Sequence, residues 1–207
     1  MAELLDEAAA IESTTVGVYR TAATVKGGRR FSFSAMVVVG DRNGHVGIGY
    51  GKANQVPPAI EKAQKEARRR MKAYPLVGRT IPHVVEGRFG ACCVRLVPAS
   101  PGTGVIAGAA VRAPLEMLGV QDCLTKSFGS NNGKNLVKAV INGLEQLRSR
   151  QFIQDLRGLE LEPSEVEEAI ERGRALVAEV ADTGAQPPTA EGEPSEPGLE
   201  PEAGGEG

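Results

Sequence analysis

The stretch from Val25 to Lys52 reads VKGGRRFSFSAMVVVGDRNGHVGIGYGK, and the first half of the chain is organised around it. From Phe31 to Val39, apolar and small polar residues alternate before an apolar run, which is typical of a strand with one buried face. The four residues 41–44 (DRNG) predict a turn, because Asn-Gly tolerates positive φ. The stretch therefore predicts a hairpin with a short connection.

The second strand of this hairpin, residues 45–52, has two unlike faces. Val46, Ile48 and Tyr50 share one face, and the other face carries glycines. A helix is expected to cover the apolar face. The bare face allows close backbone approach, and we interpret it as a surface open to RNA backbone or to another protein.

One further strand and one helix complete a first unit. Residues 16–25 predict the strand, and a Pro-Pro pair at 57–58 suits the first positions of the helix. The helix is indicated by an apolar stripe at helical spacing, formed by Ile60, Ala63, Ala67, Met71 and Tyr74. Residues 16–75 are therefore expected to form a β-β-β-α unit, after an N-terminal extension at 1–15 that could form a short helix.

A second unit of order β-β-α-β-α is predicted over residues 78–150. Its elements are expected at 79–86, 89–97 and 120–127 for the strands, and within 108–118 and 134–149 for the helices. Gly87 is expected to join the first two strands. Pro114 removes a backbone donor and disfavours a helical Ala113, so it predicts a late start or a kink in its helix.

An acidic C-terminal extension follows. Residues 158–181 predict an acidic amphipathic helix, and residues 183–207, rich in Gly, Pro and Glu, predict a disordered acidic tail. The fold class is therefore α+β, with two domains and this extension.

Charge is segregated along the chain, although the net charge is only −2. Residues 16–157 hold 22 Lys and Arg against 8 Asp and Glu, a net of +14, whereas residues 158–207 carry a net of −12. A body this basic indicates a polyanion binder. We expect the acidic extension to lie away from RNA, which would repel it.

Several classes of function have little support. The three cysteines, Cys92, Cys93 and Cys123, suit neither a disulfide framework nor a zinc site and indicate a reducing compartment. No signal peptide or apolar run of membrane-spanning length is visible, so a cytoplasmic protein is expected. With two histidines and no metal-ligand or nucleophile motif, we expect no enzyme, no cofactor and no small-molecule substrate.

Two glycine-rich loops are candidates for phosphate sites. Residues 47–52 (GIGYGK) lack the spacing of a P-loop. Residues 100–104 (SPGTG) precede a helix, so backbone N–H groups there could meet a phosphate, either of nucleic acid or, in a phosphotransferase, of a nucleotide.

Exposed cations are the stronger candidates for an RNA-binding surface. Six of them fall between 62 and 72, and others flank the same predicted sheet. The candidate phosphate contacts of the first unit are Arg20, Lys26, Arg29, Arg30, Lys52, Lys62, Lys65, Arg68, Arg69, Arg70 and Lys72, with Gly27 and Gly28 allowing close approach. The weaker candidates of the second unit are Arg112, Lys126, Asn131, Asn132 and Lys134. Aromatic residues are scarce, which favours contact with folded RNA over a stacking platform for single strands.

Two long stretches resemble a known family. Residues 25–71, from VKGGRRFSFSAMVVVGDRNGHVGIGYGK to KEARRRM, and residues 78–144, including VPASPGTGVIAGAAVRAPLEMLGV and SFGSNNGKNLVKAVINGL, are similar in order to the two halves of bacterial small-subunit ribosomal protein five. The resemblance covers nearly all of 16–150. A free-standing double-stranded-RNA binder remains the alternative.

The resemblance implies a first domain related to the double-stranded-RNA-binding fold and a second domain of the type found in some small-molecule kinases and gyrase-type ATPases. It also implies binding to 16S ribosomal RNA, contacts with small-subunit proteins four and eight, and a place near the messenger RNA entrance and the decoding region that influences accuracy. Residues Thr24, Val25, Lys26, Gly27, Gly28 and Arg29 match the family's spectinomycin-linked loop. Pro114 and the pair Gly133-Lys134 depart from the family pattern, and the resemblance says nothing about 158–207.

Overall fold

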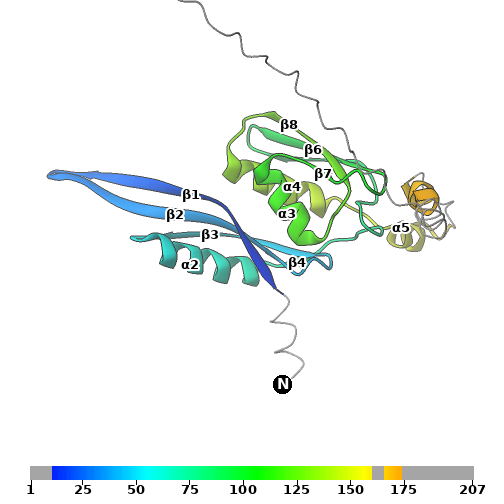
Figure 1. Ribbon diagram of the computed structural model, residues 1–207, viewed down its shortest axis with the longest axis horizontal. Helices are drawn as coiled ribbons and strands as arrows, with labels where there is room; N and C mark the ends of the chain where they lie inside the picture. Colours follow the sequence, from blue (N-terminus) through cyan, green and yellow to red (C-terminus); the bar gives the residue numbers. More distant parts are fainter. Residues whose placement is uncertain (1–10, 160–165, 174–207) are drawn as a thin grey trace, which may run out of the picture.

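The computed structural model describes residues 11–159 and 166–173, which form two β-sheets with helices packed on them (Figure 1). Residues 1–10, most of the predicted acidic helix and the predicted tail at 183–207 lie outside the described residues. Residues 12–15 belong to a strand, so the short helix suggested within 1–15 does not extend over them. The α+β class predicted from the sequence is confirmed.

The first sheet has the order β1-β2-β3-β4 and is antiparallel. Its strands are β1 (Glu12–Val25), β2 (Gly28–Gly40), β3 (His45–Ala53) and β4 (Lys72–Ala73), and helix α2 (Val56–Arg69) covers one face (Figure 1). The predicted hairpin is confirmed. Strand β1 begins at Glu12 rather than Val16, and the short strand β4 was not predicted.

The turn between β2 and β3 forms at the predicted residues. The Asp41 carboxylate accepts hydrogen bonds from the backbone N–H groups of Asn43 and His45, at 2.8 and 3.1 Å. Positive φ angles occur at Arg42 (58°) and Gly44 (92°), so Asn43 does not need one. The aspartate thus closes the turn in the way that the side chains of Asx turns do.

The glycine face of β3 is covered by α2, and the interpretation of this face as open to RNA or another protein is wrong. Three alanines of the helix, Ala59, Ala63 and Ala67, are fully buried. A Cβ atom built on Gly49 would lie 1.9 Å from the carbonyl oxygen of Ala63. Helix and strand therefore meet backbone to backbone, which only glycine permits.

The second sheet has the order β5-β6-β8-β7, with β7 parallel to β8 and the other pairs antiparallel. Its strands are β5 (Val85–Phe89), β6 (Cys92–Pro98), β7 (Val105–Ile106) and β8 (Cys123–Gly129), and its helices are α3 (Ala109–Leu118), α4 (Gly133–Glu145) and α5 (Arg150–Arg157). Helices α3 and α4 cover the face turned toward the first sheet (Figure 1).

The predicted turn at Gly87 is wrong, because Gly87 lies inside β5. A Cβ atom there would lie 1.9 Å from the carbonyl oxygen of Ala139, so the glycine allows α4 to approach the strand. The turn between β5 and β6 instead contains Gly90, whose φ is 58°. Both glycines are required, but for different reasons.

Two helix boundaries also differ from the prediction. Helix α3 starts at Ala109 and includes Pro114, so the expected late start is wrong. Helix α4 ends at Glu145 rather than Ser149, and the Ser149 side chain caps a separate helix, α5, by accepting from the N–H of Phe152. A serine favours such a cap over a position inside a helix.

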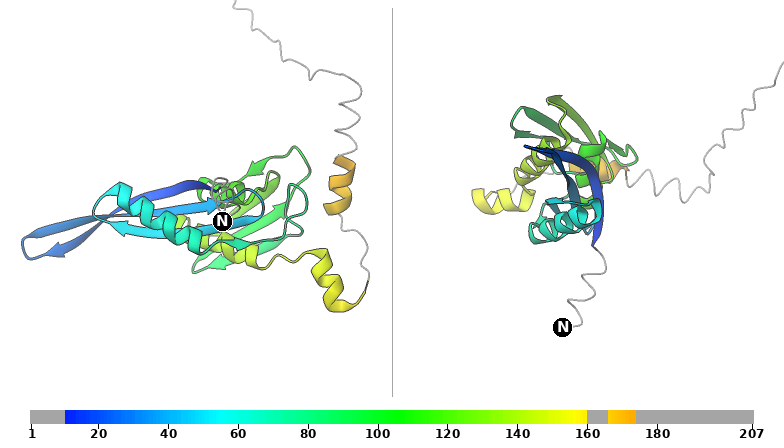
Figure 2. Two further views of the ribbon diagram at one scale, coloured as in Figure 1. Left: turned by 90° about the horizontal axis from the view of Figure 1, so that it is seen from below. Right: turned by 90° about the vertical axis from the view of Figure 1, so that its left-hand side faces the viewer.

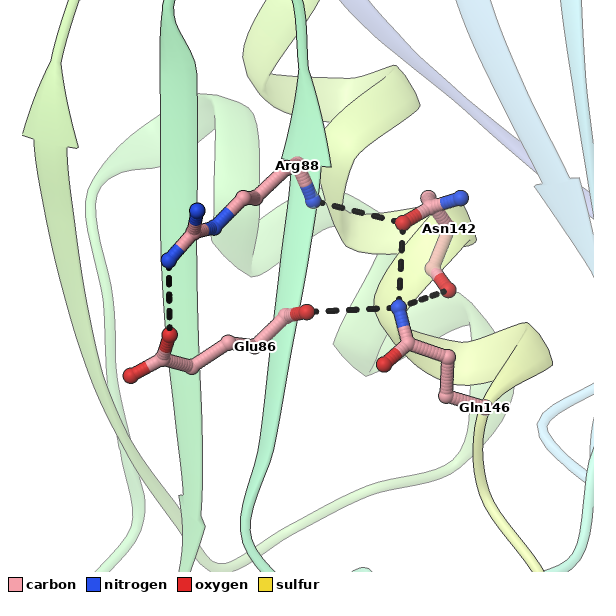
Figure 3. Close-up of polar contacts among 4 residues, drawn as sticks. All are labelled: Glu86, Arg88, Asn142 and Gln146. Atoms are coloured by element: carbon pink, nitrogen blue, oxygen red, sulfur yellow. Dashed lines mark hydrogen bonds and ion pairs between the residues drawn. The ribbon is translucent and has the colours of Figure 1, made fainter.

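A polar cluster ties α4 to the outer edge of β5 (Figure 3). The Asn142 side chain accepts from the N–H of Arg88 at 3.3 Å, and the Gln146 amide donates to the carbonyl oxygen of Glu86 at 3.2 Å. These two side chains satisfy backbone groups that an edge strand otherwise leaves unpaired.

Helix α3 joins the two units. It packs on β1, β2 and β3 as well as on α4, and one buried cluster includes Met36 and Val38 of the first sheet together with Leu115 and Leu118 of α3. The N–H of Gly44 also donates to the carbonyl oxygen of Leu118 at 2.9 Å. The relative position of the units is therefore set by a common core.

Residues 166–173 are helical, within the predicted acidic helix, and lie against the second unit. Ile170 is buried, and a Cβ atom on Gly173 would lie 2.8 Å from the Pro101 ring. Arg150 and Glu167 form an ion pair at 3.1 Å. The described part of the acidic extension is therefore packed on the core.

Candidate nucleic-acid interface

The hairpin of β1 and β2 projects beyond the rest of the first sheet (Figures 1 and 2). The two strands pair as far as Val25 and Gly28, whereas β3 pairs with β2 only as far as the Phe33–Ala53 pair. Residues 22–31 are consequently exposed on both faces of a two-stranded ribbon. Such a ribbon can approach a partner surface without displacing any other element.

The predicted loop residues lie at the tip of this ribbon. All of Thr24, Val25, Lys26, Gly27, Gly28, Arg29 and Arg30 are exposed. Gly28 has a φ of 149°, and a Cβ atom on Gly27 or Gly28 would have no neighbour within 4 Å. The backbone is thus open for close approach, and the charges of Lys26, Arg29 and Arg30 are available to phosphates.

Arg20 lies further along the same ribbon. Its guanidinium carbon is 4.8 Å from the centre of the Phe31 ring, and both side chains are exposed. A cation over an aromatic face is held in place without being neutralised. Arg20 is therefore oriented but still able to meet a phosphate.

Helix α2 carries the second group of cations. Lys62, Lys65, Arg68, Arg69 and Arg70 are all exposed, and Lys52 and Lys72 lie beyond the two ends of the helix. The nearby acid, Glu66, accepts a hydrogen bond from the N–H of Tyr50 at 2.9 Å and pairs with Arg70 at 2.8 Å. Lys72 pairs with Glu145 at 2.6 Å. Most of the helix cations are left without a carboxylate partner among the described residues.

The predicted contacts of the second unit do not form one surface. Arg112 donates to the carbonyl oxygen of Val105 at 3.0 Å, and Asn132 caps α4 by accepting from the N–H of Lys134 at 3.2 Å. Lys126 lies on the outer face of the second sheet, and Asn131 is exposed before α4. Arg112 and Asn132 therefore have structural roles within the chain.

Lys134 lies between the two units rather than on a free surface. Its ammonium is 4.4 Å from the centre of the Tyr19 ring and 4.6 Å from that of Tyr50, and it donates to the Tyr50 hydroxyl at 3.1 Å. Hydrogen bonds from Ser34 and Lys134 lower the pKa of Tyr50. This lysine is only partly exposed and is the least accessible of the predicted cations.

The structure adds two arginines that the sequence reading missed. Arg95 pairs across the strands with Lys126, and Arg88 is exposed on β5 of the same sheet. The alternation in 92–96 (CCVRL) is the signal that could have placed Arg95 outward. That alternation does hold for the cysteines, since Cys92 is buried and Cys93 is partly exposed.

Two N–H groups of the loop 100–104 are already bonded within the chain and are therefore not available to a nucleotide. The N–H of Thr103 donates to the carbonyl oxygen of Ser100 at 3.2 Å, and that of Gly104 donates to the buried Asp122 carboxylate at 2.9 Å.

Within residues 11–159 and 166–173, His, Cys, Asp and Glu side chains form no group of three that could hold a metal ion. Across the same ranges, no helix combines the length and apolar character needed to cross a membrane.

Comparison with known proteins gives two family matches in chain order. Residues 11–75 match the N-terminal domain of ribosomal protein S5, and residues 87–157 match its C-terminal domain. The small ribosomal subunit protein uS5 of Rhodopirellula baltica is 59% identical over 144 residues, covering 70% of this chain and 81% of that protein. The protein of the same name from Syntrophobacter fumaroxidans is 58% identical over 146 residues, covering 70% of this chain and 88% of that protein.

Proposed function

The chain belongs to the ribosomal protein S5 family of the small ribosomal subunit and is not an enzyme, and from this premise we propose that it holds 16S ribosomal RNA through two basic surfaces. The first surface is the tip of the β1–β2 hairpin, residues 24–30. The second is the outer side of α2, where five cations are exposed.

One observation carries this proposal. The hairpin tip combines three exposed cations with two glycines that have no neighbour where a side chain would begin. Ribosomal RNA offers closely spaced phosphates, and open backbone flanked by Lys and Arg suits them. The folded, shape-based contact that results needs few aromatic residues.

Finer parts of the proposal rest on the family resemblance. We propose contacts with small-subunit proteins four and eight, a place near the messenger RNA entrance, and an influence on translational accuracy and spectinomycin response through residues 24–29. The predicted domain limits, 16–75 and 78–150, and a cytoplasmic location belong to the same proposal. In the second unit, Lys126, Arg95 and Arg88 add exposed positive charge to one sheet, and Arg88 also pairs with Glu86 at 3.4 Å.

The test is the salt dependence of binding to 16S ribosomal RNA. Replacing Lys26, Arg29 and Arg30 by alanine should reduce the log–log salt slope by roughly two to three, since each phosphate contact contributes about 0.7–0.9. The control replaces three exposed arginines elsewhere, Arg79, Arg157 and Arg172, which removes the same charge. Equal slopes for the two triple variants would contradict the proposed surface.

Incorporation into small subunits separates this function from that of a free-standing RNA binder. The wild-type chain should co-sediment with small subunits at high salt. Binding to any duplex RNA with equal affinity, without co-sedimentation, would reject the ribosomal assignment of these surfaces.

A further inference from the structure

A groove lies at the junction of the two units, where the end of α2 and strand β4 meet α4. Its volume is about 400 Å³, within the range of roughly 300–1,000 Å³ typical of small-molecule sites. Apolar side chains of Ile48, Met71 and Ile141 line it, together with the cations Arg69 and Arg70. Apolar surface and positive charge therefore meet in one concave place.

Tyr74 supplies a hydrogen-bond donor in this groove. The residue is only 8% exposed, but its hydroxyl is accessible from the groove and makes no hydrogen bond with any residue of the described part of the chain. Burial, together with the negative charge of Glu145, raises the pKa of Tyr74 to about 12, so the phenol keeps its proton. A hydroxyl that opens into the groove and has no partner in the described part of the chain is available as a donor to a bound group.

Glu145 supplies an acceptor beside this donor. One oxygen of its carboxylate accepts from the Lys72 ammonium at 2.6 Å. A carboxylate has lone pairs for several further donors. The groove therefore offers a hydroxyl donor and a carboxylate acceptor, which together match the edge of a nucleobase that carries both a donor and an acceptor.

The charge around the groove favours a nucleotide over a peptide side chain. Arg69 forms no ion pair with any described residue, and it continues the row of cations along α2. An apolar peptide side chain would leave the Tyr74 hydroxyl unsatisfied and would not use the arginines. An RNA base brings polar edge groups, an apolar face and flanking phosphates at once.

We propose that this groove receives one unpaired nucleotide of ribosomal RNA, turned out of its stack. The base lies against Met71 and Ile141, its edge meets Tyr74 and Glu145, and its phosphates meet Arg69 and Arg70. This inference rests on the proposed function and names the contact that the C-terminal end of α2 makes. Reading an extruded base by its edge in a partly apolar pocket is an established mode of recognition.

Base-specific chemical probing of reconstituted small subunits tests the inference. Tyr74→Phe removes only the hydroxyl, and Ile141→Trp fills the groove. Tyr50→Phe is the matched control, because it removes a phenol that contacts Lys134 outside the groove. We expect Tyr74→Phe to raise the reactivity of one unpaired base roughly threefold to tenfold, as the loss of one hydrogen bond would. Ile141→Trp should expose the same base, and Tyr50→Phe should leave it unchanged.

A photocrosslinking residue in place of Met71 gives a second readout. It should crosslink to one nucleotide of 16S ribosomal RNA in the assembled subunit. Crosslinks to a neighbouring protein alone, or unchanged base reactivity in both groove variants after normal incorporation, would overturn the inference. Failure of the wild-type chain to join the subunit would instead reject the proposed function, so the two failures are distinguishable.

Discussion

Helices α2 and α4 each cover a sheet, but they pack on it through different proportions of backbone and side-chain contact. Under α2, a Cβ atom on Gly47, Gly49 or Gly51 would lie 2.3, 1.9 or 2.1 Å from an alanine carbonyl oxygen of the helix. Under α4, the buried residues are mostly large, and include Leu136, Val137, Val140 and Leu144. The first contact is made by backbone, whereas the second is mostly made by side chains.

The difference shows how a strongly basic helix can be fixed on a sheet. Close backbone approach needs only alanines on the buried side, so the remaining positions of α2 are free for lysine and arginine. Dispersion between closely packed backbones replaces the burial of large side chains. The cations of α2 are then held at a fixed height above the sheet, which suits a rigid array of phosphates.

A side chain at Gly49 should disrupt the backbone contact between α2 and β3 and have the largest effect on stability. Gly49→Val places atoms against the backbone of Ala63, which cannot move without displacing α2. The free energy of unfolding should fall by about 4 kcal/mol or more, as for severe overpacking, measured by urea denaturation. The matched control is Gly27→Ala, which meets nothing within 4 Å and should change stability by less than about 0.5 kcal/mol. Similar changes in the free energy of unfolding for the two variants would refute the close backbone contact between α2 and β3.

The sequence predicts the strands of the first sheet well but not the use of its glycines. Period-two alternation indicates which residues of β2 lie inward, and the hairpin follows from it. Glycine gives no such information, because a bare face suits a helix, RNA or a turn equally. Gly49 and Gly87 were therefore both misread, one as an open surface and one as a turn, although both accept a helix backbone.

The candidate site was predicted in a similar way. Exposed cations in 24–30 and 62–72 are visible in the sequence because runs of charge have to be solvated. The position of Lys134 was not predictable, because its partners Tyr19 and Tyr50 are distant in sequence and meet it only through the packing of α3 between the units. The groove at Tyr74 likewise exists only where α2 and α4 converge.

A cavity under α4 should be the next largest effect. Leu144 is fully buried in the core that both units share, so Leu144→Ala should cost about 3 kcal/mol through lost burial and a residual cavity. Urea denaturation followed by two probes, one in each unit, checks it. Both probes should shift together, since the core is common. A shift of the denaturation midpoint confined to the second unit would show that the two units unfold independently.

High pH should weaken the contact between the two units near Tyr74. The pKa of Tyr74 is raised from 10 to about 12 by burial first and then by Glu145, so its proton is lost more readily from the unfolded chain. Its contribution is present below pH 10 and is lost as the pH rises through 12. At pH 11 the wild type should have lost up to about 1.4 kcal/mol relative to Tyr74→Phe, and less where solvent screens the phenolate. Parallel stability curves for the two proteins between pH 8 and 11 would contradict this assignment.

The smallest expected effect concerns whether Lys134 belongs to the RNA surface or to the junction. Its ammonium contacts two rings of the first sheet and one hydroxyl, and Lys134→Met keeps the aliphatic chain while removing that charge. We expect a loss of about 1 kcal/mol in stability and an unchanged salt slope for RNA binding, because a lysine that is already partly enclosed releases no counterion from a phosphate. In a double-mutant cycle, Tyr50→Phe should reduce the cost of Lys134→Met. Unchanged stability with a slope reduced by about 0.7–0.9 would instead place Lys134 on the RNA. The cations on the outside of α2 should give that second pattern, so the same pair of measurements distinguishes charges that bind RNA from the charge that joins the units.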